Sequence, residues 1–283
     1  MTCGTGDAEN VDARVVAAFG DEWRRFDNVD LTATELEAMF QDYTSIFPWD
    51  ELSDDAVGFD AGCGSGRWAR LFAPRVGHLI CLDASADALD VARRVLAGQP
   101  NVSFRHEDLS NMEIEEASCD FGYSLGVLHH VPDTEHALRS CVRRLKPDAP
   151  FLIYLYYDLE DAGHVRRALL ALVTGIRTVV ARLPRILRHL VADLLALVVY
   201  WPLARLARVV ERIGRDPARL PLFQYRHRSV RVMRNDALDR FGTRLEKRFS
   251  QAEVLELLEE AGLVDVVFSA GPPWWVAVGR RAW

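Results

Sequence analysis

The chain has 283 residues, of which 49% are hydrophobic, and a formal net charge of −7. This apolar fraction suffices for a sizeable core and excludes a globally disordered chain. The five cysteines include no Cys-x-x-Cys pair, which argues against a disulfide scaffold, a structural zinc site or an iron–sulfur cluster and favours a reducing, cytoplasmic location. The polar, acidic N-terminus lacks a basic region followed by an apolar one, so we expect no secretory signal.

The first predicted element is an amphipathic helical stretch over residues 11–45, with apolar side chains at helical spacing. We assign residues 1–55 to an N-terminal helical lid. Two roles are open for its aromatic residues, which include Phe19, Trp23 and Phe26. They could cover a bound cofactor, or the helix could simply cover the sheet.

Residues 56–158 alternate short apolar runs with helical stretches. Five runs predict strands: "AVGFDAG", "HLICLDAS", "NVSFRHED", "CDFGYSLGVLHHV" and "APFLIYLYYD". Strands that alternate with helices indicate parallel βαβ units, and hence an α/β, doubly wound, Rossmann-like sheet. After residue 245, a helix with the capping-box pair Ser250 and Glu253 precedes two more predicted strands, "VDVVFSA" and "WWVAVGRR".

A glycine-rich loop, "DAGCGSG", follows the first predicted strand. It departs from the dinucleotide fingerprint G-x-G-x-x-G because the third glycine comes one residue early and Arg67 stands where glycine is expected. It also lacks the Lys-Ser/Thr end of a phosphate-binding P-loop. The glycines Gly62, Gly64 and Gly66 would let the backbone approach a ligand closely. The preceding acid, Asp60, suits a ligand that carries an ammonium group.

Two further acids end predicted strands. Asp83 closes the second strand, 19 residues after Gly64, where an acid commonly binds the ribose hydroxyls of an adenosine-containing cofactor. Taken alone, such a residue is more often a helix N-cap. Asp108 closes the third strand and could accept a hydrogen bond from an adenine amino group, with a loop Asx-turn as the alternative.

These motifs, followed in order by "CDFGYSLGVLHHVPD", make residues 56–158 resemble a class I S-adenosylmethionine-dependent methyltransferase, of the small-molecule subgroup that includes the ubiquinone-pathway enzymes. The resemblance implies the cofactor S-adenosyl-L-methionine, no metal, and a seven-stranded, mostly parallel sheet with an antiparallel last strand. It also implies the cofactor-binding residues, which are Asp60, Gly62, Gly64, Gly66, Asp83, Ala84, Asp108, Leu109, Leu125 and Gly126.

The candidate catalytic residues follow the fourth and fifth strands. His129 and His130 end the fourth strand, and histidine titrates near neutrality, as a base that removes a hydroxyl proton should. Some O-methyltransferases of this subgroup pair such a histidine with an aspartate after the fifth strand, where this chain has Asp158. The alternative is that His130 is structural and packs against the following helix.

The chain between residues 159 and 245 departs from the alternating pattern. Residues 164–231 contain 14 arginines and three acids, a net +11, whereas the rest of the chain sums to −18. The uncharged run 194–204 has 11 residues, fewer than the roughly 20 that span a bilayer, and arginines flank it as in interfacial helices. We predict an Arg-rich helical insertion at 159–245 and a return to the core at 246–283. A substrate cap, a peripheral membrane surface and a homodimer surface remain open roles for the insertion.

The sequence thus predicts a methyltransferase that uses S-adenosylmethionine on a small-molecule acceptor, preferably at oxygen. An NAD(P)-dependent oxidoreductase is the alternative enzyme class, and the early third glycine argues against it. A non-catalytic scaffold that keeps the fold is the third hypothesis, and the retained glycines and acids argue against it. We expect no nucleic-acid partner, because the basic segment shows no interleaved aromatic residues.

Overall fold

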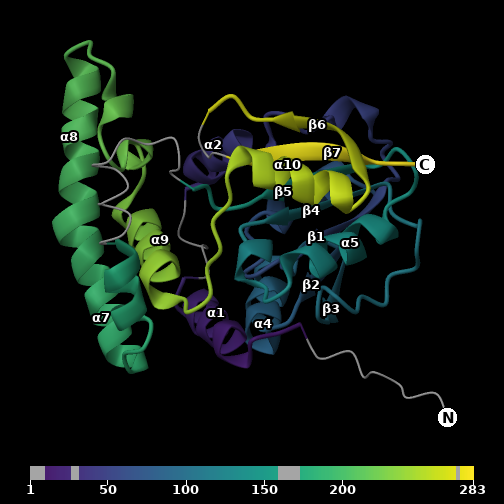
Figure 1. Cartoon of the computed structure of the whole chain (residues 1–283), viewed down its shortest axis with the longest axis horizontal. Coiled ribbons are helices and arrows are strands. Elements are labelled where there is room, and N and C mark those ends of the chain that lie inside the picture. Colours follow the sequence, from purple (N-terminus) through teal and green to yellow (C-terminus); the bar gives the residue numbers. More distant parts are fainter. Residues whose placement is uncertain (1–9, 27–31, 159–172, 272–274) are drawn as a thin grey trace. The chain divides into compact units, whose positions relative to one another are not determined.

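The computed structural model describes residues 10–26, 32–158, 173–271 and 275–283. The chain divides into two compact units, drawn in Figure 1. The first comprises Met1–Asp158 together with Leu245–Trp283, and the second comprises Leu159–Arg244. The second unit is therefore an insertion within the chain of the first. The sequence analysis predicts this insertion at residues 159–245.

The first unit is built on a seven-stranded sheet of order β3-β2-β1-β4-β5-β7-β6. Its strands are β1 (Val57–Ala61), β2 (His78–Asp83), β3 (Val102–His106), β4 (Phe121–Leu125), β5 (Pro150–Tyr154), β6 (Leu263–Phe268) and β7 (Val276–Arg281). Strands β1 to β5 pair in parallel, and β7 is antiparallel to both β5 and β6. The predicted α/β fold is confirmed. Since β1 lies between β2 and β4, the strand order reverses there, and ligands of such sheets bind beyond the carboxyl ends of the strands at this point.

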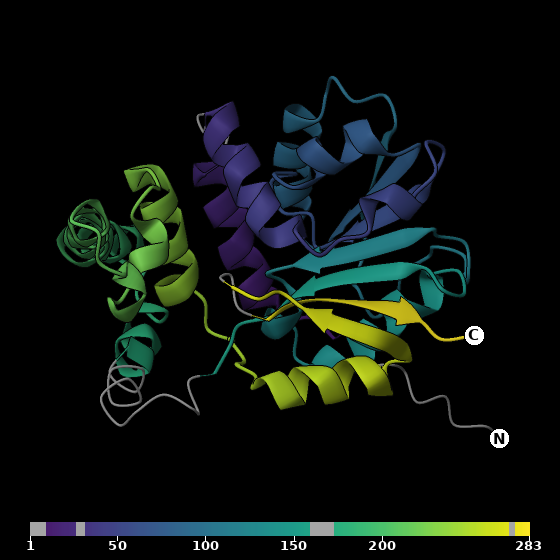
Figure 2. The ribbon, with the colours of Figure 1, turned by 90° about the horizontal axis from the view of Figure 1, so that it is seen from above.

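Helices cover both faces of the sheet, as Figure 2 shows. Helices α5 (Thr134–Arg144) and α10 (Gln251–Glu260) pack on one face, where Leu138 and Leu258 are fully buried with Phe59 of β1. The predicted capping box starts α10: the Glu253 amide donates to the Ser250 hydroxyl, and the Ser250 amide donates to the Glu253 carboxylate. Such a cap satisfies amides that a helix leaves unpaired at its start.

The other face carries α3 (Ala69–Phe72), the 3₁₀ turn η2 (Ala73–Arg75) and α4 (Ala86–Val95). Phe72 stacks on Tyr123 of β4 with a centroid distance of 3.9 Å. Phe40, from α2 (Ala33–Thr44), meets the edge of Phe72 at 5.2 Å. With the 3₁₀ turn η1 (Trp49–Glu51), these aromatic residues extend the core beyond the sheet.

The N-terminal helix α1 (Ala13–Arg25) packs against α4. Asp12 caps α1 by accepting from the amides of Arg14 and Val15. At the contact with α4, a Cβ added to Gly20 would lie 2.8 Å from the Ser85 Oγ and 3.1 Å from the Asp87 Cβ. Glycine at position 20 therefore allows α1 to lie directly on the segment that follows β2.

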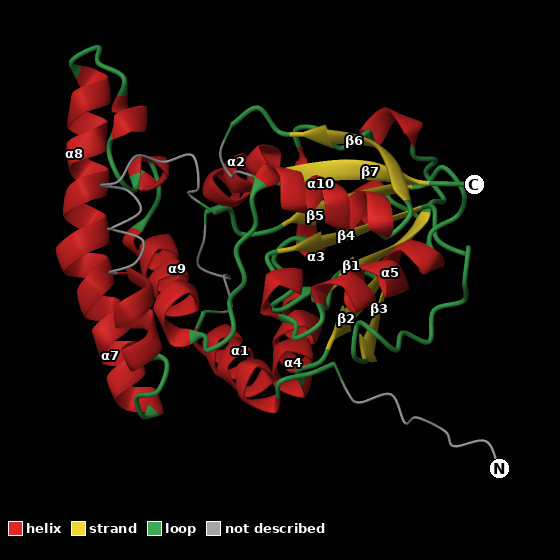
Figure 3. Ribbon diagram, viewed as in Figure 1, coloured by secondary structure: helices red, strands yellow, loops and turns green. Residues whose placement is uncertain are grey.

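The regular secondary structure in the described part of the second unit is helical, and loops connect the helices (Figure 3). Helix α7 (Arg185–Leu195) continues through a π-helical turn, η4 (Ala196–Tyr200), into α8 (Trp201–Arg212). Helix α9 (Val230–Gly242) packs against α7, and residues 173–180 and the short turns η5 (Pro217–Arg219) and η6 (Phe223–Tyr225) complete the described part.

The π-helical turn has a local cause in Pro202. Proline has no amide hydrogen, and in a regular α-helix its ring clashes with the carbonyl four residues earlier. The widened turn lies directly before this proline, so the chain continues as one helix past it. As a result, the 11-residue uncharged run noted in the sequence belongs to a helix of 28 residues.

Candidate functional site

The glycine loop after β1 has the backbone conformation that only glycine adopts readily. Gly62, Gly64 and Gly66 have φ values of +87°, +54° and +75°. The loop is also crowded: a Cβ at Gly62 would lie 2.5 Å from Val127, and one at Gly66 would lie 2.9 Å from Leu96. The three glycines are therefore required both for the turn and for its close packing.

Asp60 lies on β1 immediately before this loop and is 2% exposed. It is in register with Tyr123 of β4. Burial raises the pKa of the Asp60 carboxyl to about 8, an effect that the neighbouring Tyr123 hydroxyl only partly offsets. The Oδ2 atom of Asp60 has no hydrogen-bond partner among the described residues. A buried acceptor without a partner favours a bound donor, and a cationic donor most of all.

Asp83, at the end of β2, joins two of the predicted motifs. Its Oδ2 accepts from the Gly64 amide and its Oδ1 accepts from the Ser85 amide, both at 2.8 Å. Burial raises the pKa of Asp83, while these amide bonds act in the opposite direction. A carboxylate offers about four acceptor positions, so Asp83 keeps capacity for ribose hydroxyls. Asp83 ends β2, as the sequence predicts, whereas its hydrogen bond to the Gly64 amide was not predicted.

Asp108 lies at the same edge of the sheet, after β3. Its Oδ1 accepts from the Ser110 amide at 3.0 Å and its Oδ2 from the Asn111 side chain at 3.4 Å. It therefore forms the Asx-turn considered as its alternative role, and adenine binding by Asp108 stays a prediction. The next residue, Leu109, is buried, and the Ala84 carbonyl contacts the His106 ring at 2.9 Å, which ties the end of β3 to β2.

The fourth motif brings Leu125 and Gly126 to the end of β4. Leu125 is buried, and the Gly126 amide donates to the Tyr154 carbonyl at 3.2 Å. Gly126 has φ +82°, and the nearest atom to a Cβ added there is 3.9 Å away, on Tyr154. Glycine is required here by the backbone angle, and space remains beside it.

His130 lies in the 3₁₀ turn η3 (Leu128–His130) and is 4% exposed. Its Nδ1 lies 2.6 Å from the Leu245 carbonyl oxygen. Because a carbonyl can only accept, we infer from this bond that Nδ1 carries the proton and that Nε2 is the basic nitrogen of the neutral ring. Phe19 of α1 meets the His130 ring edge-on at 4.9 Å.

His129 is completely buried and stacks on Tyr156 with a centroid distance of 3.9 Å. Neither of its ring nitrogens has a hydrogen-bond partner among the described residues. Burial holds the pKa of His129 well below its ordinary value, and His130 and Arg248 lower it further. His129 is therefore a neutral imidazole, and a catalytic role for it stays a prediction.

Residues 245–249, which we call the returning segment, bind the candidate catalytic residues through the backbone. Besides the Leu245 carbonyl at His130, the Lys247 amide donates to the His129 carbonyl and the Phe249 amide to the Tyr156 carbonyl, both at 2.9 Å. No motif marks this segment in the sequence, and its role was missed. The one feature of the sequence that could have indicated this role is the position of the segment between the predicted insertion and the capped helix.

Asp158 follows β5, and its amide donates to the Phe249 carbonyl at 2.7 Å. The sequence led us to expect that its carboxylate orients His130. The Nδ1 of His130 is instead held by the Leu245 carbonyl. At this nitrogen a backbone atom of the returning segment orients the ring, and the predicted role of Asp158 toward His130 stays a prediction.

Helix α1 places aromatic side chains on both parts of the site. A Cβ added to Gly64 would lie 2.8 Å from the indole of Trp23, so Trp23 packs directly on the glycine loop. The Arg67 guanidinium lies 5.8 Å from the Trp23 ring centroid and 4.3 Å from that of Trp68. With Phe19 on His130, α1 contacts both the glycine loop and a candidate catalytic residue, and its role as a lid stays a prediction.

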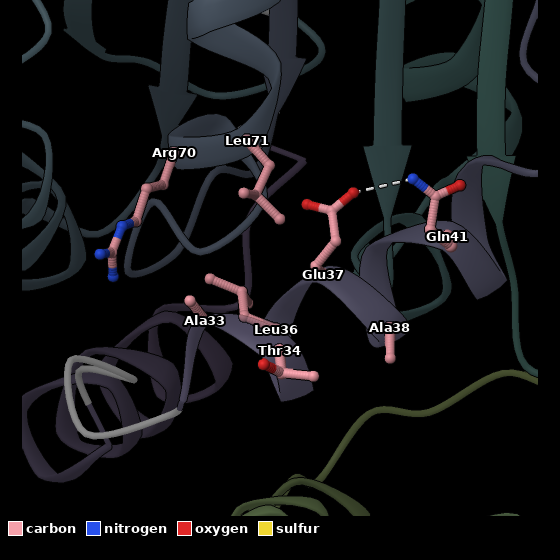
Figure 4. A pocket seen from close by; sticks show the side chains of 8 residues that line it. All are labelled: Ala33, Thr34, Leu36, Glu37, Ala38, Gln41, Arg70 and Leu71. Carbon is pink, nitrogen blue, oxygen red and sulfur yellow. Dashed lines mark hydrogen bonds between the residues drawn. The ribbon is translucent and has the colours of Figure 1, made fainter.

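A surface pocket lies elsewhere, between α2 and α3 (Figure 4). Its lining residues are Ala33, Thr34, Leu36, Glu37, Ala38, Gln41, Arg70 and Leu71. It contains none of the predicted site residues, and Glu37 and Gln41 bind each other in it at 2.8 Å. We therefore place the candidate site at the carboxyl edge of the sheet. Within the described residues, no group of three or more His, Cys, Asp or Glu could hold a metal ion.

The residues at this edge fit S-adenosylmethionine. The unpartnered Oδ2 of Asp60 suits the α-ammonium group, the glycine loop allows close approach to the aminoacyl end, and Asp83 has acceptor capacity for the ribose. An anionic pyrophosphate could not form such an ion pair with the Asp60 carboxylate, so this position suits a dinucleotide poorly.

Comparison with known proteins finds similarity to methyltransferases. Residues 59–153 match the family model described as a methyltransferase domain. Arsenite methyltransferase of Aquipseudomonas alcaligenes is 37% identical over 129 residues, which cover 41% of this chain and 37% of that protein. Ubiquinone biosynthesis O-methyltransferase of Paracidovorax citrulli is 27% identical over 129 residues, covering 44% of this chain and 52% of that protein. The chain thus spans about a third to a half of these curated relatives.

Among solved structures, a methyltransferase of Thermotoga maritima described as a possible histamine N-methyltransferase has a TM-score of 0.51 and 15% identity, covering 94% of this chain and 99% of that one. This likeness shows the fold. Fold, glycine loop and family match together define a class I S-adenosylmethionine-dependent methyltransferase domain. The match to the methyltransferase-domain family extends over residues 59–153 of the 283.

Proposed function

We propose that this protein methylates a hydroxyl oxygen of a small-molecule acceptor, with His130 as the general base. The observation that carries the proposal is the bond between the His130 Nδ1 and the Leu245 carbonyl. This bond selects the tautomer whose Nε2 can accept a proton. The Paracidovorax relative is an O-methyltransferase, which supports oxygen as the acceptor atom.

When bound, S-adenosylmethionine supplies an electrophilic methyl group on a positively charged sulfur. Asp60 holds the ammonium group, and Asp83 holds the ribose while it fixes the glycine loop through the Gly64 amide. The His130 Nε2 would accept the proton of the acceptor hydroxyl, and the cofactor would supply the methyl group to that oxygen and leave as the neutral thioether. The resulting imidazolium keeps its Nδ1–H on the Leu245 carbonyl, so the ring need not turn during the reaction.

The surroundings of His130 favour an acceptor with a flat apolar part. Phe19, His129 and Tyr156 all contact the His130 ring, with centroid distances of 4.9, 4.1 and 5.8 Å. The buried His129 is neutral, so it adds no positive charge to these surroundings. Aromatic rings stack well on such groups, and we therefore place phenols and catechols first among candidate acceptors.

The test combines two measurements on the purified full chain and its His130→Gln variant. Calorimetry should show cofactor affinity within about twofold of wild type, because His130 is not assigned to the cofactor. Formation of S-adenosylhomocysteine from a panel of phenols should fall about a hundredfold or more. His136→Gln, an exposed histidine on α5, is the control and should keep turnover. Retained turnover in His130→Gln would remove His130 as the base.

A further inference from the structure

The helix formed by α7, η4 and α8 exposes its large apolar side chains. We call the following residues its apolar face, with exposed fractions between 44% and 73%: Ile186, Leu187, Leu190, Leu194, Leu197, Val198, Trp201, Leu206 and Val209. The exposed apolar area of soluble monomers is usually scattered or confined to small patches. A row of nine such side chains along one helix indicates a contact surface.

The buried side of the same helix carries mostly alanine. The buried residues from Ala192 onward are Ala192, Ala196, Tyr200, Ala204 and Ala207. Tyr200 contacts Tyr225 at 5.3 Å, within the second unit. A helix that covers the core of a soluble protein has the opposite arrangement, with its large aliphatic residues inside. On this helix the larger apolar side chains are exposed instead.

The π-helical turn keeps the two sides separate along the helix. Four residues of a regular α-helix turn about 400°, so buried positions spaced four apart drift by about 40° at each step. The turn at Ala196–Tyr200 accommodates an extra residue and limits this drift. The apolar face therefore continues along a helix of 28 residues, about 42 Å long.

The charges of the helix are arranged to match an anionic surface. Arg182 and Arg185 are exposed near its start, and Arg212 and Arg215 near its end. Its acids are paired within the second unit: Asp193 with Arg234 at 2.9 Å, and Glu211 with Arg226 at 2.8 Å. The ends of the apolar face are thus positive, which is the pattern of helices that lie on anionic lipid headgroups.

We propose that this face docks, in the plane of the membrane, on a bilayer that contains anionic lipids. The helix is long and apolar enough to cross a membrane by length and composition, and 28% of its most apolar window is buried. The in-plane arrangement is favoured because α9 packs along α7 and pairs Arg234 with Asp193. A spanning α7–α8 would carry this ion pair and the charged α9 into the hydrocarbon, which is costly.

Vesicle co-sedimentation of the full chain tests the proposal. Wild type should bind vesicles of phosphatidylcholine with phosphatidylglycerol, bind phosphatidylcholine alone much less, and dissociate as salt rises. Leu190→Asp should weaken binding about tenfold or more, because it removes a large apolar contact. Arg185→Gln and Arg212→Gln should each weaken it about fivefold. Val267→Asp is the matched control, since Val267 is exposed on β6 at 55%.

Circular dichroism and cofactor binding verify that Leu190→Asp is folded. Equal binding of wild type and Leu190→Asp, or no dependence on anionic lipid, overturns the proposal. A lipid-free dimer that Leu190→Asp converts to monomer, with no vesicle binding by wild type, assigns the face to a second copy and also overturns it. Alkaline carbonate should release the bound protein from vesicles; retention would indicate a spanning helix instead.

Discussion

The Asp83 carboxylate accepts a hydrogen bond from the Gly64 amide at 2.8 Å, which joins the end of β2 to the glycine loop after β1. The residue that we assign to the ribose therefore also fixes the loop against which we place the aminoacyl end of the cofactor. In this assignment one side chain serves both halves of the proposed cofactor site.

Replacing Asp83 should cost more than a ribose contact. In Asp83→Ala the Gly64 amide loses its partner, so we expect a free energy of unfolding lower by about 1–3 kcal/mol and a cofactor affinity at least about tenfold weaker. Denaturant unfolding and calorimetry measure the two effects. Asp87→Ala, an exposed acid on α4 paired with Arg24, is the control. Unchanged cofactor affinity in Asp83→Ala would contradict the assignment.

Asp60 should release a proton when the cofactor binds. With a pKa of about 8, its carboxyl is mostly protonated at pH 7, and an ammonium group beside it stabilises the ionised form. Calorimetry at pH 7 in two buffers with different ionisation enthalpies should reveal the released proton, and cofactor affinity should rise with pH toward neutrality. Asp60→Asn should bind the cofactor weakly and show no such proton. A buffer-independent binding enthalpy in wild type would refute this role.

The same carboxyl should affect stability in the absence of cofactor. Between pH 3.8 and about 8, Asp60 is protonated in the folded chain and ionised in the unfolded chain. The unfolded state then binds fewer protons, so the free energy of unfolding falls as pH rises through this window. Unfolding curves of wild type and Asp60→Asn should diverge accordingly, with wild type losing stability relative to the variant.

Gly20 should control the docking of α1. Gly20→Val would place atoms within 2.8 Å of the Ser85 Oγ and 3.1 Å of the Asp87 Cβ, so α1 must shift away from α4. We expect faster proteolytic cleavage in α1 and a loss of about 1–3 kcal/mol. Gly98→Val is the control, because nothing lies within 4 Å of a Cβ added there. Equal cleavage rates for the two variants would show that the contact is dispensable.

Local patterns in the sequence were sufficient to predict the strands and the glycine loop. The strand-forming runs, the glycine spacing and the Ser250–Glu253 cap each depend on a few adjacent residues, and the structure confirms all three. The partner of His130 could not be found in this way, since Leu245 is 115 residues distant in the chain. Folding brings this backbone carbonyl to the ring, and the orienting role that the sequence suggests for Asp158 stays a prediction.

The long helix shows a second limit of local patterns. Its sequence is apolar on more than one side, so periodicity alone does not distinguish the side with Ala192 and Ala196 from the side with Leu190 and Leu194. The packing of α9 decides which side is buried. The uncharged run by itself is too short to span a bilayer, and the sequence does not show that the helix continues through Pro202 to a length of 28 residues.

The two ends of the insertion meet at one place in the first unit. Tyr157 forms a parallel bridge with Phe249, and the Asp158 amide donates to the Phe249 carbonyl at 2.7 Å. Because these contacts join the residues just before and just after the insertion, the inserted segment can be replaced by another without a change in the sheet. These contacts close the first unit across the start and end of the insertion, so the sheet does not depend on the inserted residues to hold its own chain ends together.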